Sequence, residues 1–191
     1  MDELEPSERK ELLRTARATL REYLATGKVP PGKPDREKLH RPAGSFVTLK
    51  THPDGRLRGC IGTFSTDTPL YQCIQQMAVS AGTRDPRFDA VEPDELDQLT
   101  IEISVLSPRQ RLERPEELIV GRHGVYITQG RRHGVLLPQV AVEHGWDRET
   151  FLGHVCQKAG LPTDAWKNPD AVLEVFTADV FGEDDEAPQD T

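Results

Sequence analysis

The sequence predicts an α+β protein in which a mostly antiparallel sheet is flanked by helices. Stretches with apolar residues at every third or fourth position, typical of amphipathic helices, are interspersed with stretches that alternate apolar and polar residues, typical of strands. The alternating stretches come in pairs joined by short turns. No regular strand–helix–strand repetition indicates a parallel sheet, so α+β is the natural class.

The first helix is expected to begin near Ser7 and to end at Gly27, after which a stretch rich in proline, residues 30–34, forms a stiff connector. One face of this helix is apolar and should pack on the body of the protein. Its apolar positions are spaced by three or four residues: Leu13, Ala16, Leu20 and Leu24.

Residues 44–50 and 57–64 predict a hairpin, because Asp54-Gly55 between them tolerates the positive φ of a tight turn. A helix is expected from about 69 to 81, where apolar residues again follow the helical spacing. Residues 99–107 alternate most regularly and predict a strand with one face in the core.

The C-terminal half predicts a second hairpin with strands at 124–129 and 134–137. A short helix is expected after Pro138 and a longer one from about 147 to 159, closed by Gly-Leu-Pro. Residues 171–181 are rich in β-formers and should return to the sheet.

The formal net charge is −8, and much of the excess lies in the last ten residues, which carry five acidic and no basic side chains. We therefore expect one domain over residues 7–182 and a disordered acidic tail over 183–191. The absence of a Lys/Arg cluster argues against nucleic-acid binding, and no apolar run is long enough to span a membrane. Three distant cysteines fit a reducing cytoplasm.

The sequence lacks the motifs of several common classes of binding and catalytic site. The chain has no phosphate-binding P-loop, no dinucleotide-binding glycine pattern and no nucleophile elbow. None of its six histidines pair at helical spacing with a glutamate between them, so the sequence indicates no metal site. No cofactor is indicated either.

The segment Leu57-Arg58-Gly59-Cys60-Ile61-Gly62 is the best candidate for a working site. Strand alternation predicts that Leu57 and Ile61 point into the core, while Arg58 and Cys60 lie side by side on the other face. A guanidinium next to a thiol favours the reactive thiolate. The alternative is that Cys60 is a small buried hydrophobic residue.

The glycines of this segment, Gly59 and Gly62, weaken a strand and need a reason. One reason is the close approach of a ligand or of another backbone to Cys60. The other is a β-bulge. The residues alone leave both readings open.

Four further side chains are candidates on other elements. In the charged turn 84–88, Arg87 could bind a carboxylate or phosphate with Asp85 orienting it, or the turn could be purely structural. Glu102 could reach the face of Cys60 if their strands share a sheet, or it could simply face water. His123, between two glycines, could move a proton, or it could cap a turn.

At these residues the chain resembles the AMMECR family, whose bacterial and archaeal branch is called AmmeMemoRadiSam system protein A. The resemblance covers about residues 7–182. It rests on these segments: LRGCIGTF at 57–64, RDPRF at 84–88, IEISVLS at 101–107, GRHGV at 121–125, LLPQVAVEHGWD at 136–147 and FLGHVCQKAGLP at 151–162.

The resemblance implies a main lobe that holds both termini and a smaller inserted lobe, with the LRGCIG strand beside a cleft between them. It also implies a genomic association with a Memo-like protein and a radical SAM protein. It supplies no reaction.

Two hypotheses follow. In the first, the chain is an enzyme that acts on a small polar or anionic substrate in the cleft: Cys60 is the nucleophile, Arg58 and Arg87 bind the anion, and His123 or Glu102 moves the proton. In the second, it is a non-catalytic accessory subunit that binds the Memo-like or radical SAM protein.

Overall fold

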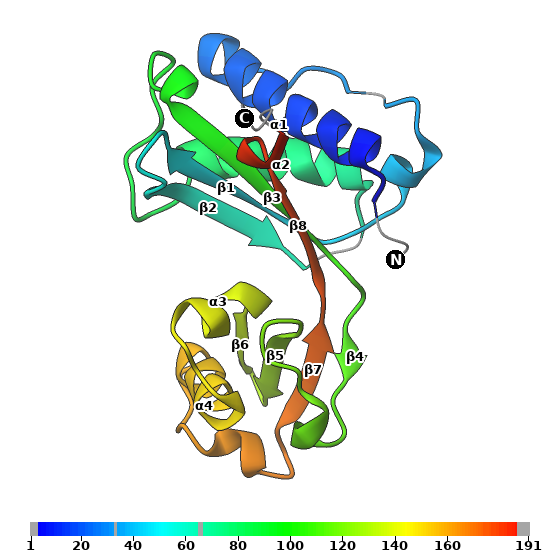
Figure 1. The fold of residues 1–191 in the computed structure, drawn as a ribbon, viewed down its shortest axis with the longest axis vertical. Helices are drawn as coiled ribbons and strands as arrows, with labels where there is room; N and C mark the ends of the chain where they lie inside the picture. Colours follow the sequence, from blue (N-terminus) through cyan, green and yellow to red (C-terminus); the bar gives the residue numbers. More distant parts are fainter. Residues whose placement is uncertain (1–3, 33, 65–66, 187–191) are drawn as a thin grey trace, which may run out of the picture. The chain divides into compact units, whose positions relative to one another are not determined.

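The computed structural model describes residues 4–32, 34–64 and 67–186, and the chain divides into two compact units (Figure 1). The first unit comprises residues up to Leu106 together with those from Asp179 onward, and the second runs from Ser107 to Ala178. The α+β class, with a smaller unit inserted into one that holds both ends of the chain, is therefore confirmed.

The first unit contains a four-stranded sheet in the order β2-β1-β3-β8. Its central strand β1 pairs antiparallel with both β2 and β3. The predicted hairpin at 44–64 is confirmed as β1 and β2. The bounds are β1 Ser45–Thr51, β2 Leu57–Thr63, β3 Leu99–Leu106 and β8 Ala178–Gly182.

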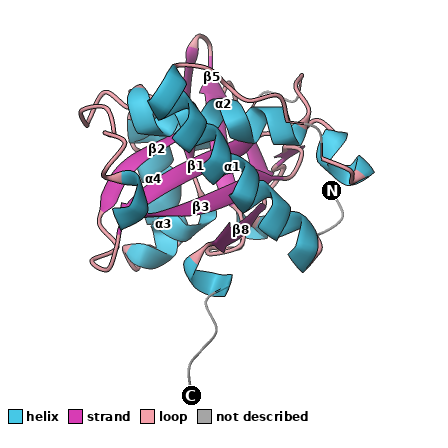
Figure 2. Ribbon diagram, turned by 90° about the horizontal axis from the view of Figure 1, so that it is seen from above, coloured by secondary structure: helices cyan, strands magenta, loops and turns pink. Residues whose placement is uncertain are grey.

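Two helices, α1 (Pro6–Thr26) and α2 (Leu70–Thr83), cover one face of this sheet (Figure 2). Helix α1 begins with a capping box, in which the Glu5 N–H donates to the Glu8 carboxylate at 2.8 Å, and it ends at Gly27 in the left-handed conformation. The core is built from the apolar positions of both helices and the inward faces of β1 and β3. Lys33, in the expected connector, lies outside the described residues.

The second unit has its own sheet, in the order β4-β7-β5-β6, and a separate core formed with α3 and α4. The predicted hairpin at 124–137 and both predicted helices are present. The bounds are β4 Gln110–Arg111, β5 Gly124–Gln129, β6 Arg132–Leu136, α3 Pro138–Glu143, α4 Arg148–Lys158 and β7 Val172–Phe176. The β-rich stretch 171–181 thus supplies two strands, β7 in this sheet and β8 in the other.

The prediction that Leu57 points into the core is wrong, because this side chain is 41% exposed. The strand register shows the cause: Leu49 pairs with Gly59, but the next residue, Lys50, pairs with Leu57. Arg58 is the extra residue of a β-bulge, which reverses the alternation at the start of β2. Ile61, beyond the bulge, does pack against the core as predicted.

Glu183, which the sequence places in a disordered tail, is instead held in the first unit. Its carboxylate pairs with Arg17 of α1 and accepts a hydrogen bond from the Ile101 N–H at 2.8 Å. A short 3-10 helix, Asp184–Glu186, follows. Residues 187–191 of the expected tail lie outside the described residues. In the described part of the chain, no helix is long and apolar enough to cross a membrane.

Candidate functional site

Cys60 belongs to a row of three side chains that crosses the first sheet. Cys60 on β2 pairs with Thr48 on β1, which in turn pairs with Glu102 on β3. Because Val47 and Leu49 of β1 face the core, this row lies on the face opposite to α1 and α2. Cys60 is half-buried, and the Thr48 hydroxyl donates to its sulfur at 3.3 Å. The thiol is therefore bordered by a polar group on the sheet face that α1 and α2 do not cover.

Glu102 shares this face with Cys60, but its carboxylate is engaged elsewhere. The Lys50 ammonium donates to it at 2.7 Å. Two strand spacings put the backbones of Cys60 and Glu102 about 10 Å apart, with Thr48 between them. A direct proton transfer between the two side chains would need movement of both, and Thr48 is the residue placed to bridge them.

Asp85 and Arg87 close the free edge of β2 at Cys60. The Asp85 carboxylate accepts a hydrogen bond from the Cys60 N–H at 2.9 Å, and Arg87 Nη2 donates to the Cys60 carbonyl at 3.4 Å. The two side chains also bind each other, through Arg87 Nε at 2.9 Å and Nη2 at 2.6 Å. The hydrogen bonds from Arg87 and from the Cys60 N–H hold the pKa of Asp85 well below its usual range.

Arg87 differs from Asp85 in exposure: its side chain is 53% exposed, against 2% for that of Asp85. The Asp85 hydrogen bonds raise the pKa of the Arg87 guanidinium, which stays charged. Within the described residues, its Nη1 atom makes no hydrogen bond. One edge of a fixed guanidinium is thus available to an anion.

Arg58 is held more completely than Arg87. Its Nε and Nη2 donate to the Glu95 carboxylate at 3.1 and 3.0 Å, and its Nη atoms reach the carbonyls of Asp89 and Ala90. The hydrogen bonds from Arg58 lower the pKa of Glu95. The charge of Arg58 is therefore balanced by Glu95, and its guanidinium fastens β2 to the segment between α2 and β3.

A surface cavity of about 470 Å³ joins the two arginines. Arg58 and Arg87 line it together with Pro86, Phe88 and Asp89. The guanidinium of Arg87 lies over the Phe88 ring, 5.4 Å from its centroid. The two arginines that the sequence suggested as anion ligands thus share one cavity at the edge of β2.

Both glycines of the segment are explained by packing. A Cβ on Gly59 would lie 2.2 Å from the Ala81 carbonyl oxygen of α2, and a Cβ on Gly62 would lie 2.1 Å from the Phe46 ring. Both reasons considered from sequence apply at Gly59, which another backbone approaches and which directly follows the β-bulge at Arg58. Gly62 has a third reason, the Phe46 ring that covers it. Their role as ligand contacts stays a prediction.

His123 lies in the second unit, whereas Cys60 lies in the first. Its Nδ1 accepts a hydrogen bond from the Ile119 N–H at 3.3 Å, which makes it the cap of its own turn. Burial, and secondarily Arg122, lower the pKa of His123. A cleft shared by the two units and a joint action of His123 with Cys60 stay predictions.

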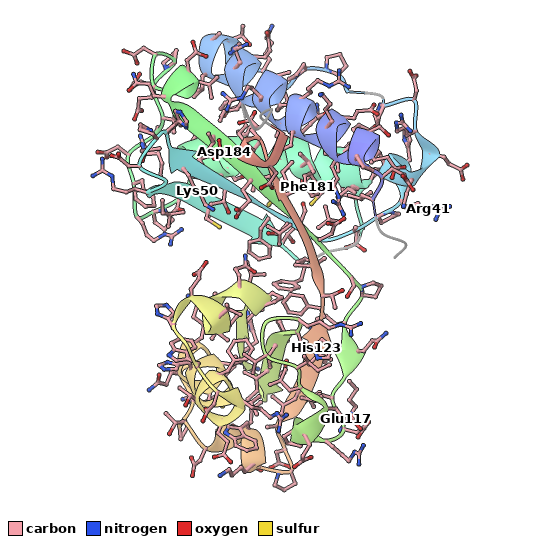
Figure 3. The ribbon with its side chains drawn as sticks, in the orientation of Figure 1. Arg41, Lys50, Glu117, His123, Phe181 and Asp184 are labelled. Atoms are coloured by element: carbon pink, nitrogen blue, oxygen red, sulfur yellow. The ribbon has the colours of Figure 1, made fainter. Side chains whose placement is uncertain are left out.

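Figure 3 shows where His123 and Lys50 lie in the fold.

Sequence reasoning missed three neighbours of the candidate residues. Thr48 and Lys50 are placed beside Cys60 and Glu102 by the register of β1, and Glu95 is placed beside Arg58 by the path of the 84–98 segment. Across the described ranges, no group of three or more His, Cys, Asp or Glu side chains could hold a metal ion.

Comparison with known proteins establishes the family. The family model AMMECR1 matches residues 13–181, which is most of the chain. The chain belongs to the AMMECR1 family. The matched range includes the whole second unit, most of the first and every candidate residue described above.

Relatives within the AMMECR1 family are similar over almost their whole length. The chain is 46% identical to Protein MK0488 of Methanopyrus kandleri, over 91% of this chain and 87% of that protein. It is 41% identical to Protein MJ0810 of Methanocaldococcus jannaschii, over 90% of this chain and 88% of the relative. The crystal structure of uncharacterized protein PH0010 from Pyrococcus horikoshii matches with a TM-score of 0.85 and 42% identity, covering 91% and 90% of the two chains. These names state no activity, so function rests on the site.

Proposed function

We propose that this AMMECR1-family chain is an enzyme that acts on a small anionic substrate at β2, with Arg87 as the anion contact and Cys60 as the nucleophile. The observation that carries the proposal is that one arginine, Arg87, both contacts the Cys60 backbone and lines the open cavity. Asp85 would serve as the positioning residue, because it fixes the Arg87 guanidinium and the Cys60 N–H at once.

The charges that line the cavity favour binding of a small anion with one or two charges over binding of a polyanion. Arg58 is paired with Glu95, and Asp89 also lines the cavity, so the surplus positive charge is small. The guanidinium edge at Arg87 suits a carboxylate or a phosphate group. The Thr48 hydroxyl, which donates to the Cys60 sulfur, would stabilise the thiolate, and Glu102 or His123 would accept the proton of the thiol.

Binding is tested by titrating the protein with phosphate or succinate and following backbone amide NMR signals. The proposal predicts saturable shifts at Cys60 and Arg87, and affinity that falls by about tenfold or more in Arg87→Ala. Arg21→Ala is the matched control, because Arg21 is an exposed arginine of the same unit paired with Asp97. If the titration shifts the NMR signals of Arg87→Ala and wild type equally, the anion binds elsewhere. If no signal shifts in a saturable way, the proposed anion site is refuted.

Catalysis is tested separately by incubating the protein with a small-molecule extract and comparing the metabolites by mass spectrometry with those of a Cys60→Ser sample. An enzyme depletes at least one anionic compound only when Cys60 is present. Saturable binding without such depletion would refute the enzyme and favour an accessory subunit. Affinity capture with the Memo-like and radical SAM proteins then tests that alternative.

The compartment is part of the same proposal. A nucleophilic Cys60 requires a reducing environment such as the cytoplasm, and all three cysteines are free. Fractionation of the native cell, with the chain recovered in the cytoplasmic fraction, would support this location.

A further inference from the structure

The second unit contains a cavity of about 360 Å³ that is separate from the Cys60 site. One wall is a single face of α4, where the lining residues Thr150, Gly153, His154 and Gln157 are three or four positions apart. The other wall is the segment from Thr163 to Lys167, which includes the 3-10 helix Ala165–Lys167.

Aromatic rings form part of both walls. His154 of α4 is stacked on Trp146, with centroids 3.8 Å apart and planes 10° from parallel, and Trp146 also stacks on His144 at 4.7 Å. Trp166 of the opposite wall is half-buried. The imidazole of His154 is thus fixed by its neighbour, and the cavity has a preformed aromatic lining.

Gly153 is the residue that packing does not explain. It lies in the interior of α4, where glycine is less stable than alanine. A Cβ at this position would meet nothing closer than the Thr163 carbonyl oxygen at 3.5 Å, an ordinary contact. By contrast, a Cβ on Gly59 would clash with the Ala81 carbonyl oxygen, and one on Gly62 would clash with the Phe46 ring. Because Gly153 lines the cavity, its missing side chain keeps that space open.

The charges of the lining define the ligand. Two carboxylates, Glu149 and Asp164, face a single ammonium, Lys167, so an anion is not favoured. The Lys167 ammonium already lies over the Trp166 ring, 4.8 Å from its centroid, and occupies the place that a cationic ligand would take. Carboxylates that accept hydrogen bonds, beside an ammonium that donates them, are complementary to hydroxyl groups.

From this geometry we infer that the cavity binds a small neutral ligand rich in hydroxyl groups, of the monosaccharide or cyclic polyol class. The hydroxyls donate to Glu149 and Asp164 and accept hydrogen bonds from the Lys167 ammonium, which lies over the Trp166 ring. Gly153 provides the room for it on the helix side.

Tryptophan fluorescence reports on this cavity specifically, because the two tryptophans of the chain are Trp146 and Trp166. Full-length protein is titrated with D-glucose, D-ribose and myo-inositol, and with choline and phosphorylated glucose as charged probes. The inference predicts a saturable change in emission with at least one neutral probe, and weaker binding of the charged probes. No saturable response to any neutral probe, or tighter binding of a charged one, would overturn it.

Two variants locate the binding. Gly153→Leu fills the cavity and is expected to lower the affinity for the neutral probe by about tenfold or more. Lys158→Leu, on the same helix but outside the cavity, is expected to change that affinity by less than about twofold. Should Gly153→Leu fail to fold, Asp164→Asn, which alters an exposed side chain, is expected to weaken binding by about fivefold or more. Unchanged affinity in a folded Gly153→Leu or in Asp164→Asn would contradict the assignment.

Discussion

The carboxylate of Asp85, although almost completely buried, accepts a hydrogen bond from the backbone N–H of Cys60 at 2.9 Å. This contact replaces the partner strand that β2 lacks on its outer side, and Arg87 completes it by binding the Cys60 carbonyl. The turn at 84–88 therefore has a structural role and a candidate ligand-binding role at once, divided between Asp85 inside and Arg87 outside.

Asp85→Asn is expected to destabilise the first unit by about 2–4 kcal/mol, because the amide keeps only one acceptor oxygen and its NH2 group would leave some of the N–H donors of Cys60 and Arg87 unpaired. Urea unfolding followed by circular dichroism measures the change. Asp97→Asn is the matched control, since that carboxylate is exposed and its loss should cost less than about 1 kcal/mol. A cost for Asp85→Asn no larger than the control would contradict the role given to this contact.

The stability that Asp85 contributes is expected to depend on pH. The folded-state pKa of Asp85 is depressed, so its contribution is fully present above the unfolded value of about 3.9 and is lost as the pH falls further. Wild type should therefore lose stability below about pH 4 more steeply than Asp85→Asn. Parallel acid profiles of the two proteins would show that Asp85 is not the group responsible.

Gly59→Ala is expected to destabilise the protein by about 1–3 kcal/mol, because the new Cβ would collide with the Ala81 carbonyl of α2. Gly153→Ala is the control with the opposite sign and should stabilise the protein by about 0.5–1 kcal/mol, since it removes a glycine from a helix interior without a clash. Thermal unfolding separates them. Two shifts in the same direction would contradict the packing described here.

Arg58→Lys should cost about 1–2 kcal/mol, because lysine cannot bind Glu95 in a bidentate manner and also reach the carbonyls of Asp89 and Ala90. Arg21→Lys, at an exposed ion pair, should cost less than about 0.5 kcal/mol. Equal stability of the two variants in urea would mean that the Arg58 guanidinium is not structural and is available to a ligand.

His123 gives a second pH prediction. Its folded-state pKa is lowered by burial and by Arg122, so its contribution to stability is full above the unfolded value of about 6.5 and decreases as the pH falls. His123→Asn offers a similar acceptor to the Ile119 N–H but does not titrate, so its melting temperature should fall less between pH 7 and pH 5. Identical slopes in scanning calorimetry would contradict this interpretation.

Regular patterns in the sequence were sufficient for the helices and strands, whereas the shared face of Cys60 and Glu102 required the register of β1 with β2 and β3. The alternation of β3 holds from Leu99 to Ile103, with Ile101 and Ile103 in the core and Glu102 opposite, and ends where Ser104 and Leu106 are buried as well. The placement of Leu57 failed because a bulge at Arg58 adds a residue that leaves no mark in the hydrophobic pattern.

Tertiary contacts decided what sequence could only raise as alternatives. Glycine at Gly59 signals a close approach, but only the packing of α2 identifies the Ala81 carbonyl as its cause. Asp85 is buried within a charged turn, although aspartate is usually exposed. Its burial is explained by the edge of β2, where the Cys60 N–H has no partner strand and donates to Asp85 instead. Thr48 becomes a neighbour of Cys60 only through the register of the hairpin.

The account depends most on an accessible thiol at Cys60, and alkylation of the folded protein tests it most directly. Cys73 and Cys156 are buried, and burial raises the pKa of both thiols, so they should react slowly with iodoacetamide at neutral pH. We predict that intact-mass analysis shows one adduct, which peptide mapping places on Cys60, while the denatured chain takes up an adduct on each of its 3 cysteines. Modification of Cys73 or Cys156 before Cys60, or an unmodified Cys60 in the folded protein, would contradict the central claim.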